Sequence, residues 1–146
     1  MAKILVAYHS IGGNTEKVAR AVAEGAGSVE GVEVSLKMAA DVTPEDFKTA
    51  DGFALGTPDY FSYMAGMLKD MFDRVFYDVK AGTEGKPCVC FVTHGGGGKA
   101  TESLSRICNS FKLDRFGETL SIQAPVTDEH VAAARELGKT LAGKLL

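Results

Sequence analysis

The stretch Tyr8-His9-Ser10-Ile11-Gly12-Gly13-Asn14-Thr15-Glu16 decides how the rest of this chain is interpreted. An unbroken apolar run at residues 4–7 precedes it and is typical of a strand buried on both faces. Apolar residues at helical spacing follow it over residues 17–25 and end at a glycine. The stretch is therefore a strand-to-helix turn rich in glycine and side-chain hydroxyl groups.

Two interpretations fit this turn. In the first, backbone N–H groups and the positive end of the helix point at one place and bind an anion. In the second, the turn is a plain connection in which Asn14 or Thr15 caps the helix. The turn alone does not decide between them, because short glycine motifs occur often by chance.

Composition narrows the class of protein. The chain has 146 residues, 45% hydrophobic and 24% charged, which predicts one soluble globular domain spanning residues 1–146. A net charge of −3 without a basic run argues against a nucleic-acid partner. No apolar segment approaches the roughly 20 residues of a membrane span, and the chain enters a strand without a signal peptide, so we expect a cytoplasmic protein.

The three cysteines lack the CxxC spacing of a metal or redox motif and predict reduced thiols. Cys88 and Cys90 lie two apart in an expected strand and therefore share a face. No second pair of ligands lies near them in the sequence, so we interpret them as core residues and not as metal ligands.

Strand and helix patterns alternate five times. The expected strands cover residues 4–7, 32–38, 52–56, 87–93 and 119–123. Thr43 is expected to cap a short second helix that has Pro44 in its first position. The third helix is expected to bury an apolar stripe of Met64, Met67, Leu68, Met71, Phe72 and Val75. The fourth helix carries Leu104, Ile107, Cys108 and Phe111, and the last carries Val131, Ala134, Leu137, Leu141 and Leu145.

This alternation predicts an α/β fold, a doubly wound parallel sheet of five strands between two helical layers. The first, third and fourth strands are continuously apolar and should be interior, whereas the second and fifth alternate and should be edges. With right-handed crossovers this gives the strand order 2-1-3-4-5. Ligands bind such sheets at the carboxyl ends of the strands, where the order reverses between the first and third.

Three unusual loops lie at those carboxyl ends. One is the turn at residues 10–15, the second is the aromatic segment Thr57-Pro58-Asp59-Tyr60-Phe61-Ser62-Tyr63, and the third is His94-Gly95-Gly96-Gly97-Gly98-Lys99. A turn suited to an anion, an aromatic loop and a glycine loop together predict a phosphorylated, flat, aromatic ligand.

At this point the chain resembles the flavodoxin-like family over essentially its whole length. The family's phosphate loop, Ser/Thr-x-Thr-Gly-x-Thr, is similar to Ser10-Ile11-Gly12-Gly13-Asn14-Thr15, which implies FMN as the cofactor. Gly12 departs from the pattern because the family usually has a hydroxyl there, a difference worth about 0.5–1.5 kcal/mol of binding. The resemblance implies cofactor contacts at Ser10, Ile11, Gly12, Gly13, Asn14, Thr15, Thr57, Pro58, Asp59, Tyr60, Phe61, Ser62, Thr93, His94, Gly95, Gly96, Gly97 and Gly98.

The aromatic segment at residues 57–63 has a more specific resemblance, to one group of enzymes. It is similar to the flavin loop of the flavodoxin-like NAD(P)H:quinone oxidoreductases, which reads Gly-x-Pro-x-x-Phe-Gly-x-Met. The resemblance implies that Tyr60 and Phe61 border the flavin ring. The alternative is that these aromatic side chains fill a hydrophobic corner. His94 either lines the ring edge, takes part in proton or hydride chemistry, or is a surface histidine.

Other motifs fail on spacing. Gly98-Lys99-Ala100 lacks the first glycine and the hydroxyl residue of a P-loop. Gly95, Gly97 and Ala100 fit a dinucleotide fingerprint only in the wrong strand–helix unit. A response-regulator receiver would carry acidic residues after the first and third strands, where this chain has Ser10 and Thr57.

Three functions remain open, and no residue is identified as a catalytic nucleophile or acid–base pair. The first is an electron carrier that moves electrons between redox partner proteins through non-covalently bound FMN. The second is a small NAD(P)H:quinone oxidoreductase, and the third a non-catalytic FMN-binding interaction module. We favour the carrier because the chain lacks the extra segment that the quinone reductases insert, and we expect a monomer or a weak homo-oligomer.

Overall fold

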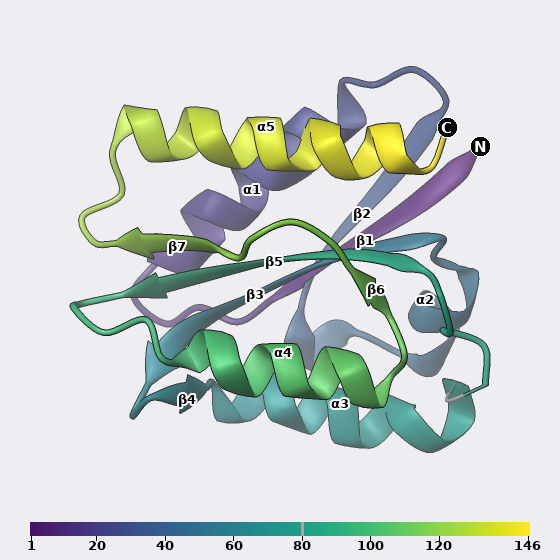
Figure 1. Ribbon diagram of the computed structural model, residues 1–146, viewed down its shortest axis with the longest axis horizontal. Helices are drawn as coiled ribbons and strands as arrows, with labels where there is room; N and C mark the ends of the chain where they lie inside the picture. The colour runs from purple at the N-terminus through teal and green to yellow at the C-terminus, as the bar shows by residue number, and fades with distance from the viewer. Residues whose placement is uncertain (80) are drawn as a thin grey trace.

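The computed structural model describes residues 1–79 and 81–146 as a central twisted sheet between two layers of helices (Figure 1). Its strands are β1 (Ala2–Tyr8), β2 (Val32–Met38), β3 (Gly52–Tyr60), β4 (Tyr63–Met64), β5 (Pro87–His94), β6 (Asp114–Arg115) and β7 (Leu120–Gln123). The parallel order is β2-β1-β3-β5, and both β6 and β7 pair with β5. Since β7 is the expected fifth strand, the predicted order is confirmed.

The helices divide between the two faces of the sheet. On one face lie α1 (Asn14–Gly27) and α5 (Asp128–Lys144), and on the other α3 (Gly66–Val79) and α4 (Ala100–Ser110) (Figure 1). The 3₁₀ turn η1 (Ala39–Asp41) and α2 (Pro44–Thr49) join the second face. Each face has its own buried cluster: Val22 and Leu141 belong to the first, Leu68 and Leu104 to the second.

Two residues of the buried stripe expected on the third helix are wrong: Met67 lies in α3 but is exposed, and Met64 is not helical. Met64 lies in β4, where it pairs with Asp59, and α3 begins only at Gly66. The spacing of Met64 from the methionines that follow imitates a helix, but a tight hairpin brings this residue back against β3. The hairpin also extends β3 beyond the predicted end at residue 56 to Tyr60. Much of the aromatic loop is therefore strand.

Close packing of α1 on α5 fixes the direction of α1. A Cβ atom added to Gly25 would lie 1.9 Å from the carbonyl oxygen of Arg135, and one added to Gly138 would lie 2.0 Å from the carbonyl oxygen of Val22. Only glycine allows two helix backbones to approach this closely. Because α5 holds α1 in place, the amino end of α1 has a fixed position at the carboxyl edge of the sheet.

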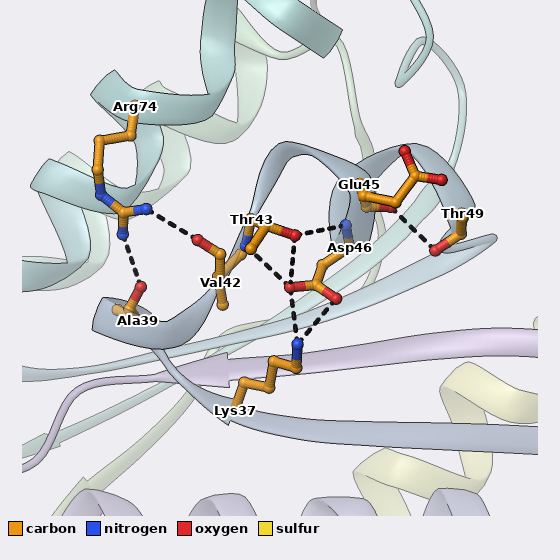
Figure 2. A network of polar contacts seen from close by, with 8 residues as sticks. All are labelled: Lys37, Ala39, Val42, Thr43, Glu45, Asp46, Thr49 and Arg74. Atoms are coloured by element: carbon orange, nitrogen blue, oxygen red, sulfur yellow. Dashed lines mark hydrogen bonds and ion pairs between the residues drawn. The ribbon is translucent and has the colours of Figure 1, made fainter.

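A polar network secures the amino end of α2 (Figure 2). Thr43 and Asp46 form a capping box, and Lys37 Nζ lies 3.0 Å from both carboxylate oxygens of Asp46. Burial favours a raised pKa for Asp46, but the hydrogen bonds from Thr43 and Lys37 outweigh it and lower that pKa. Arg74 donates hydrogen bonds to the carbonyl oxygens of Ala39 and Val42, both at 2.8 Å. The predicted cap at Thr43 is confirmed.

Among the described residues, no helix combines the length and the apolar character that crossing a membrane requires.

Candidate functional site

A cavity of about 240 Å³ opens at the carboxyl edge of the sheet, where the strand order reverses. It is lined by Ser10, Ile11, Gly12, Asn14, Thr15, Pro58, Asp59, Tyr60, Thr93, His94, Gly95 and Ala124. The first five follow β1, the next three end β3, and the following three belong to β5 and the loop after it. The structure thus brings parts of all three predicted loops to one cavity.

The amino end of α1 lacks the side-chain cap that α2 and α5 have. Thr43 and Thr127 form capping boxes at the starts of α2 and α5. The residue in the same position before α1 is Gly13, which has no side chain to accept hydrogen bonds from the first turn. Asn14 and Thr15 lie inside the helix, so the interpretation in which one of them caps α1 is wrong. The first amides of α1, which have no partner within the helix, remain available to an anion.

We call residues 10–15 the anion turn. Gly13 adopts φ 99°, a left-handed conformation that favours glycine, and its N–H donates a hydrogen bond to Ser10 Oγ at 3.1 Å. The hydroxyl oxygens of Thr15 and Thr93 lie 2.7 Å apart in a buried hydrogen bond. This bond ties the start of α1 to the end of β5. The anion turn is therefore held in shape by the protein itself.

We call residues 60–63 the aromatic hairpin. Its two central residues, Phe61 and Ser62, have φ values of 57° and 63°, both left-handed as in a type I′ turn. The Phe61 side chain is fully exposed, while the Tyr60 ring lies edge-on to the His9 ring with their centroids 6.2 Å apart. Burial lowers the pKa of His9, so the imidazole beside Tyr60 is neutral near pH 7.

The predicted contacts at Gly13, Thr57, Phe61, Ser62, Gly96, Gly97 and Gly98 do not line the cavity. Thr57 is fully buried, and its hydroxyl donates to the carbonyl oxygen of Pro58 at 2.7 Å and accepts from the amide of Ala65 at 2.9 Å. The Thr57 hydroxyl thus links the chain on the two sides of the aromatic hairpin and stabilises its base. Ser62 instead borders a second cavity of about 320 Å³, beside Glu102 and Arg106 of α4.

The cavity also has features that sequence reasoning missed. Ala124, which follows β7 and precedes Pro125, lines it. The sequence could have indicated this contact, because Ala124 directly follows the expected fifth strand and parallel strands end at the same edge of a sheet. His94 Nδ1 is buried without a hydrogen-bond partner within the described part of the chain, and a bound ligand can supply the missing partner.

These features fit the FMN that the resemblance implies. Among the described lining residues the only acidic or basic side chains are Asp59 and His94, so a phosphate there depends on amides and hydroxyls and not on a lysine or arginine. The uncapped amino end of α1 supplies those amides, and Ser10 and Asn14 supply polar side chains. Tyr60 and Pro58 supply an apolar wall for a flat ring.

Comparisons with known proteins agree with this arrangement. A family model described as NADPH-dependent FMN reductase matches residues 36–123. A flavodoxin from Aquifex aeolicus (strain VF5) is 35% identical over 159 residues, covering 97% of this chain and 86% of that protein. An NAD(P)H dehydrogenase (quinone) from Acidithiobacillus ferrooxidans is 34% identical over 94 residues, covering 51% of this chain and 47% of that protein. Among solved structures, a flavodoxin from the domain Archaea superposes with a TM-score of 0.89 at 25% identity, covering 98% of each chain.

Proposed function

We propose that this chain, which belongs to the flavodoxin-like family and is an FMN-binding redox protein, carries electrons between partner proteins. The observation that carries this proposal is the likeness to a flavodoxin across 97% of the chain. When bound, the flavin accepts and gives up electrons, and the protein supplies binding, orientation and electrostatics.

The residues of the cavity have distinct parts in this proposal. The amides of the anion turn, with Ser10 and Asn14, hold the phosphate at the amino end of α1. Tyr60 and Pro58 flank the ring, and His94 offers its unpartnered Nδ1 to the ring edge. Asp59 places a negative charge in the cavity wall, which disfavours a negatively charged reduced flavin and lowers the reduction potential.

The net charge and the thiols bear on the partners and the cellular location of the protein. A net charge of −3 favours docking on partners with basic surfaces. The three cysteines are free and buried, which supports a role in the reducing cytoplasm.

A second candidate is a small NAD(P)H:quinone oxidoreductase. The aromatic hairpin resembles the flavin loop of those enzymes, and the NAD(P)H dehydrogenase (quinone) relative supports the same activity. In this function NAD(P)H would supply two electrons and a quinone would receive them, with FMN held by the same residues of the cavity.

An anaerobic titration of the FMN-loaded protein separates the two functions. We expect dithionite to populate a one-electron-reduced flavin, visible in the absorbance spectrum, and expect no reduction by NADH or NADPH. Bleaching by either nucleotide, reversed by a quinone, would instead establish the oxidoreductase. Flavin that binds but is reduced by neither route would indicate a non-catalytic binding module.

The phosphate assignment is tested by comparing FMN with riboflavin, which lacks the phosphate. Asn14→Ala should weaken FMN binding several-fold by removing one polar contact, and should leave riboflavin binding unchanged. The matched control is Asn109→Ala on the exposed surface of α4, which should change neither affinity. Equal FMN affinities for the Asn14 variant and the control would remove Asn14 from the phosphate site.

A further inference from the structure

The three cysteines of the chain converge in the core between β5 and α4. Cys88 and Cys90 lie on one face of β5, and Cys108 comes from α4. The Sγ atom of Cys108 lies 4.0 Å from that of Cys88 and 3.8 Å from that of Cys90, and all three sulfurs lie within 4.8 Å of one another. The sequence pattern placed Cys88 and Cys90 on one face of a strand and favoured core residues over metal ligands. It did not bring Cys108, 18 residues farther along the chain than Cys90, beside them.

The spacing of the sulfurs matches that of ligands around one metal ion. Thiolate sulfurs lie about 2.3 Å from an ion such as Zn²⁺, so two of them are about 4.0 Å apart in trigonal geometry and about 3.8 Å apart in tetrahedral geometry. The two separations from Cys108, 4.0 and 3.8 Å, fall at these values, and the sulfurs of Cys88 and Cys90 lie within 4.8 Å of each other. A disulfide needs sulfurs about 2.05 Å apart, so either pair would have to move much farther to form one.

The surroundings select the kind of ion. Within residues 1–79 and 81–146, the only group of three or more cysteine, histidine or acidic side chains with ligand atoms this close consists of these cysteines, and no fourth such side chain joins it. Its neighbours in the same buried cluster, such as Leu104, Phe111 and Val92, are apolar. Hard cations prefer oxygen ligands, and structural zinc prefers four ligands. Three sulfurs in an apolar site suit a soft ion that accepts three ligands, which is Cu(I).

The thiolate is the metal ligand, so each thiol of the cluster releases its proton when its sulfur binds an ion.

The cluster is separate from the FMN cavity. Cys88 and Cys90 alternate with Thr93 across β5: the cysteines face α4, whereas Thr93 faces α1 through its bond to Thr15. Along the strand, Cys90 and Thr93 are about 10 Å apart at about 3.3 Å per residue. Occupation of one site therefore leaves the contacts of the other intact.

We propose that Cys88, Cys90 and Cys108 form a three-coordinate thiolate site for Cu(I). Each coordinating thiol gives its proton to water when its sulfur binds the ion, and no electron is transferred. Arg115 of β6, which pairs with Cys88 of β5, offsets part of the negative charge that the thiolates bring into the core.

The experiment is an anaerobic titration of the FMN-loaded protein with Cu(I) in competition with a coloured Cu(I) chelator. We expect one ion per chain, proton release to a pH indicator, and an X-ray absorption spectrum with three sulfurs at about 2.3 Å. Zn²⁺ should bind more weakly because the site lacks a fourth ligand.

Variants test the requirement for all three sulfurs. Cys88→Ala, Cys90→Ala and Cys108→Ala should each raise the Cu(I) dissociation constant about 100-fold or more, with FMN affinity unchanged. Val92→Ala is the matched control, because Val92 lies on the same face of β5 and is equally buried but has no sulfur. This variant should keep the Cu(I) affinity of the parent protein. If an alanine variant fails to fold, the serine variant is measured in its place. The number of Cu(I) ions per chain and the number of sulfur ligands are measured on the unaltered protein, so they do not depend on any variant.

Several results would overturn the proposal. They are a Cu(I) affinity below that of the chelator, a spectrum with only two sulfurs, tighter binding of Zn²⁺ than of Cu(I), or any single cysteine variant that binds Cu(I) as tightly as Val92→Ala.

Discussion

The anion turn and the aromatic hairpin both need left-handed backbone, but they use different residues for it. The anion turn has glycine there, Gly13 at φ 99°. The aromatic hairpin has Phe61 at φ 57° and Ser62 at φ 63°, both with side chains. Left-handed backbone costs a residue with a side chain about 1–2 kcal/mol, and glycine almost nothing. The turn on one side of the cavity is therefore relaxed, and the turn next to Tyr60 on the other side is strained.

Their contacts differ in the same sense. Buried hydroxyls of Thr15 and Thr93 tie the anion turn to β5. The aromatic hairpin is held at its base by two residue pairs and by the Thr57 hydroxyl, but its tip, Phe61, is fully exposed. A site that binds a phosphate gains from a turn already in its bound shape, because no ordering cost is added on binding. A strained and exposed wall can change conformation at low cost. We infer that the phosphate end is fixed before the cofactor arrives and that the ring end adjusts.

The largest expected effect comes from breaking the bond that fixes the anion turn. Thr15→Val leaves the Thr93 hydroxyl buried without its partner and should lower the free energy of unfolding by about 1–3 kcal/mol. Thr93→Val should do the same for the hydroxyl of Thr15. Urea unfolding of the apoprotein measures both.

The double variant is the control for this bond. With both threonines replaced by valine no hydroxyl is left unpaired, so the apoprotein should regain most of its stability. Single effects that simply add in the double variant would show that the two hydroxyls do not depend on each other.

A smaller loss should follow from removing the glycine. Gly13→Ala places a side chain at φ 99° and should lower the free energy of unfolding by about 1–2 kcal/mol, and FMN affinity with it. Gly12→Ala is the matched control: the neighbouring position has open space around it and lacks the left-handed backbone. Its stability should change by less than about 0.5 kcal/mol. Equal losses in the two variants would mean that the left-handed backbone at position 13 is not required.

The contrast between these two parts of the site was only half visible in the sequence. The parallel order, the edge strands and the convergence of three loops follow from strand patterns, because a strand buried on both faces must be apolar throughout. The cap of α1 did not follow, since helical periodicity locates a boundary only to within a few residues. The sequence therefore favoured Asn14 or Thr15 as the cap, whereas the residue in that position is Gly13.

The aromatic hairpin was missed for a different reason. Two-residue hairpins are recognised by glycine or asparagine in the turn, and here Phe61 and Ser62 occupy those positions. The spacing of Met64 from Met67 and Leu68 then favoured a helix. The sequence did not predict the thiol cluster for a third reason. Contact between Cys90 and Cys108 depends on how α4 packs on β5 and not on a local sequence pattern.

A gain of binding should follow from adding the hydroxyl that the family usually has in the anion turn. Gly12→Thr places that hydroxyl beside the cavity and should tighten FMN binding by about 0.5–1.5 kcal/mol. Riboflavin affinity should not change, because the new contact is to the phosphate. Gly12→Ala serves again as the control. A gain of equal size for riboflavin would place the new side chain against the ring and not the phosphate.

The smallest expected effect relieves the strain of the aromatic hairpin. Ser62→Gly removes a side chain from φ 63° and should raise the free energy of unfolding by about 0.5–1 kcal/mol, since glycine adopts this backbone freely but loses more entropy on folding. The Ser62 side chain is exposed, so little packing is lost. Ser110→Gly, which puts glycine at an ordinary position at the end of α4, should instead lower stability. If the hairpin strain is what lets the cavity wall adjust, the Ser62 variant should also bind FMN with a changed association rate, measured by stopped-flow quenching of flavin fluorescence. A more stable protein with an unchanged rate would separate the strain from the adjustment and leave the hairpin as a passive wall.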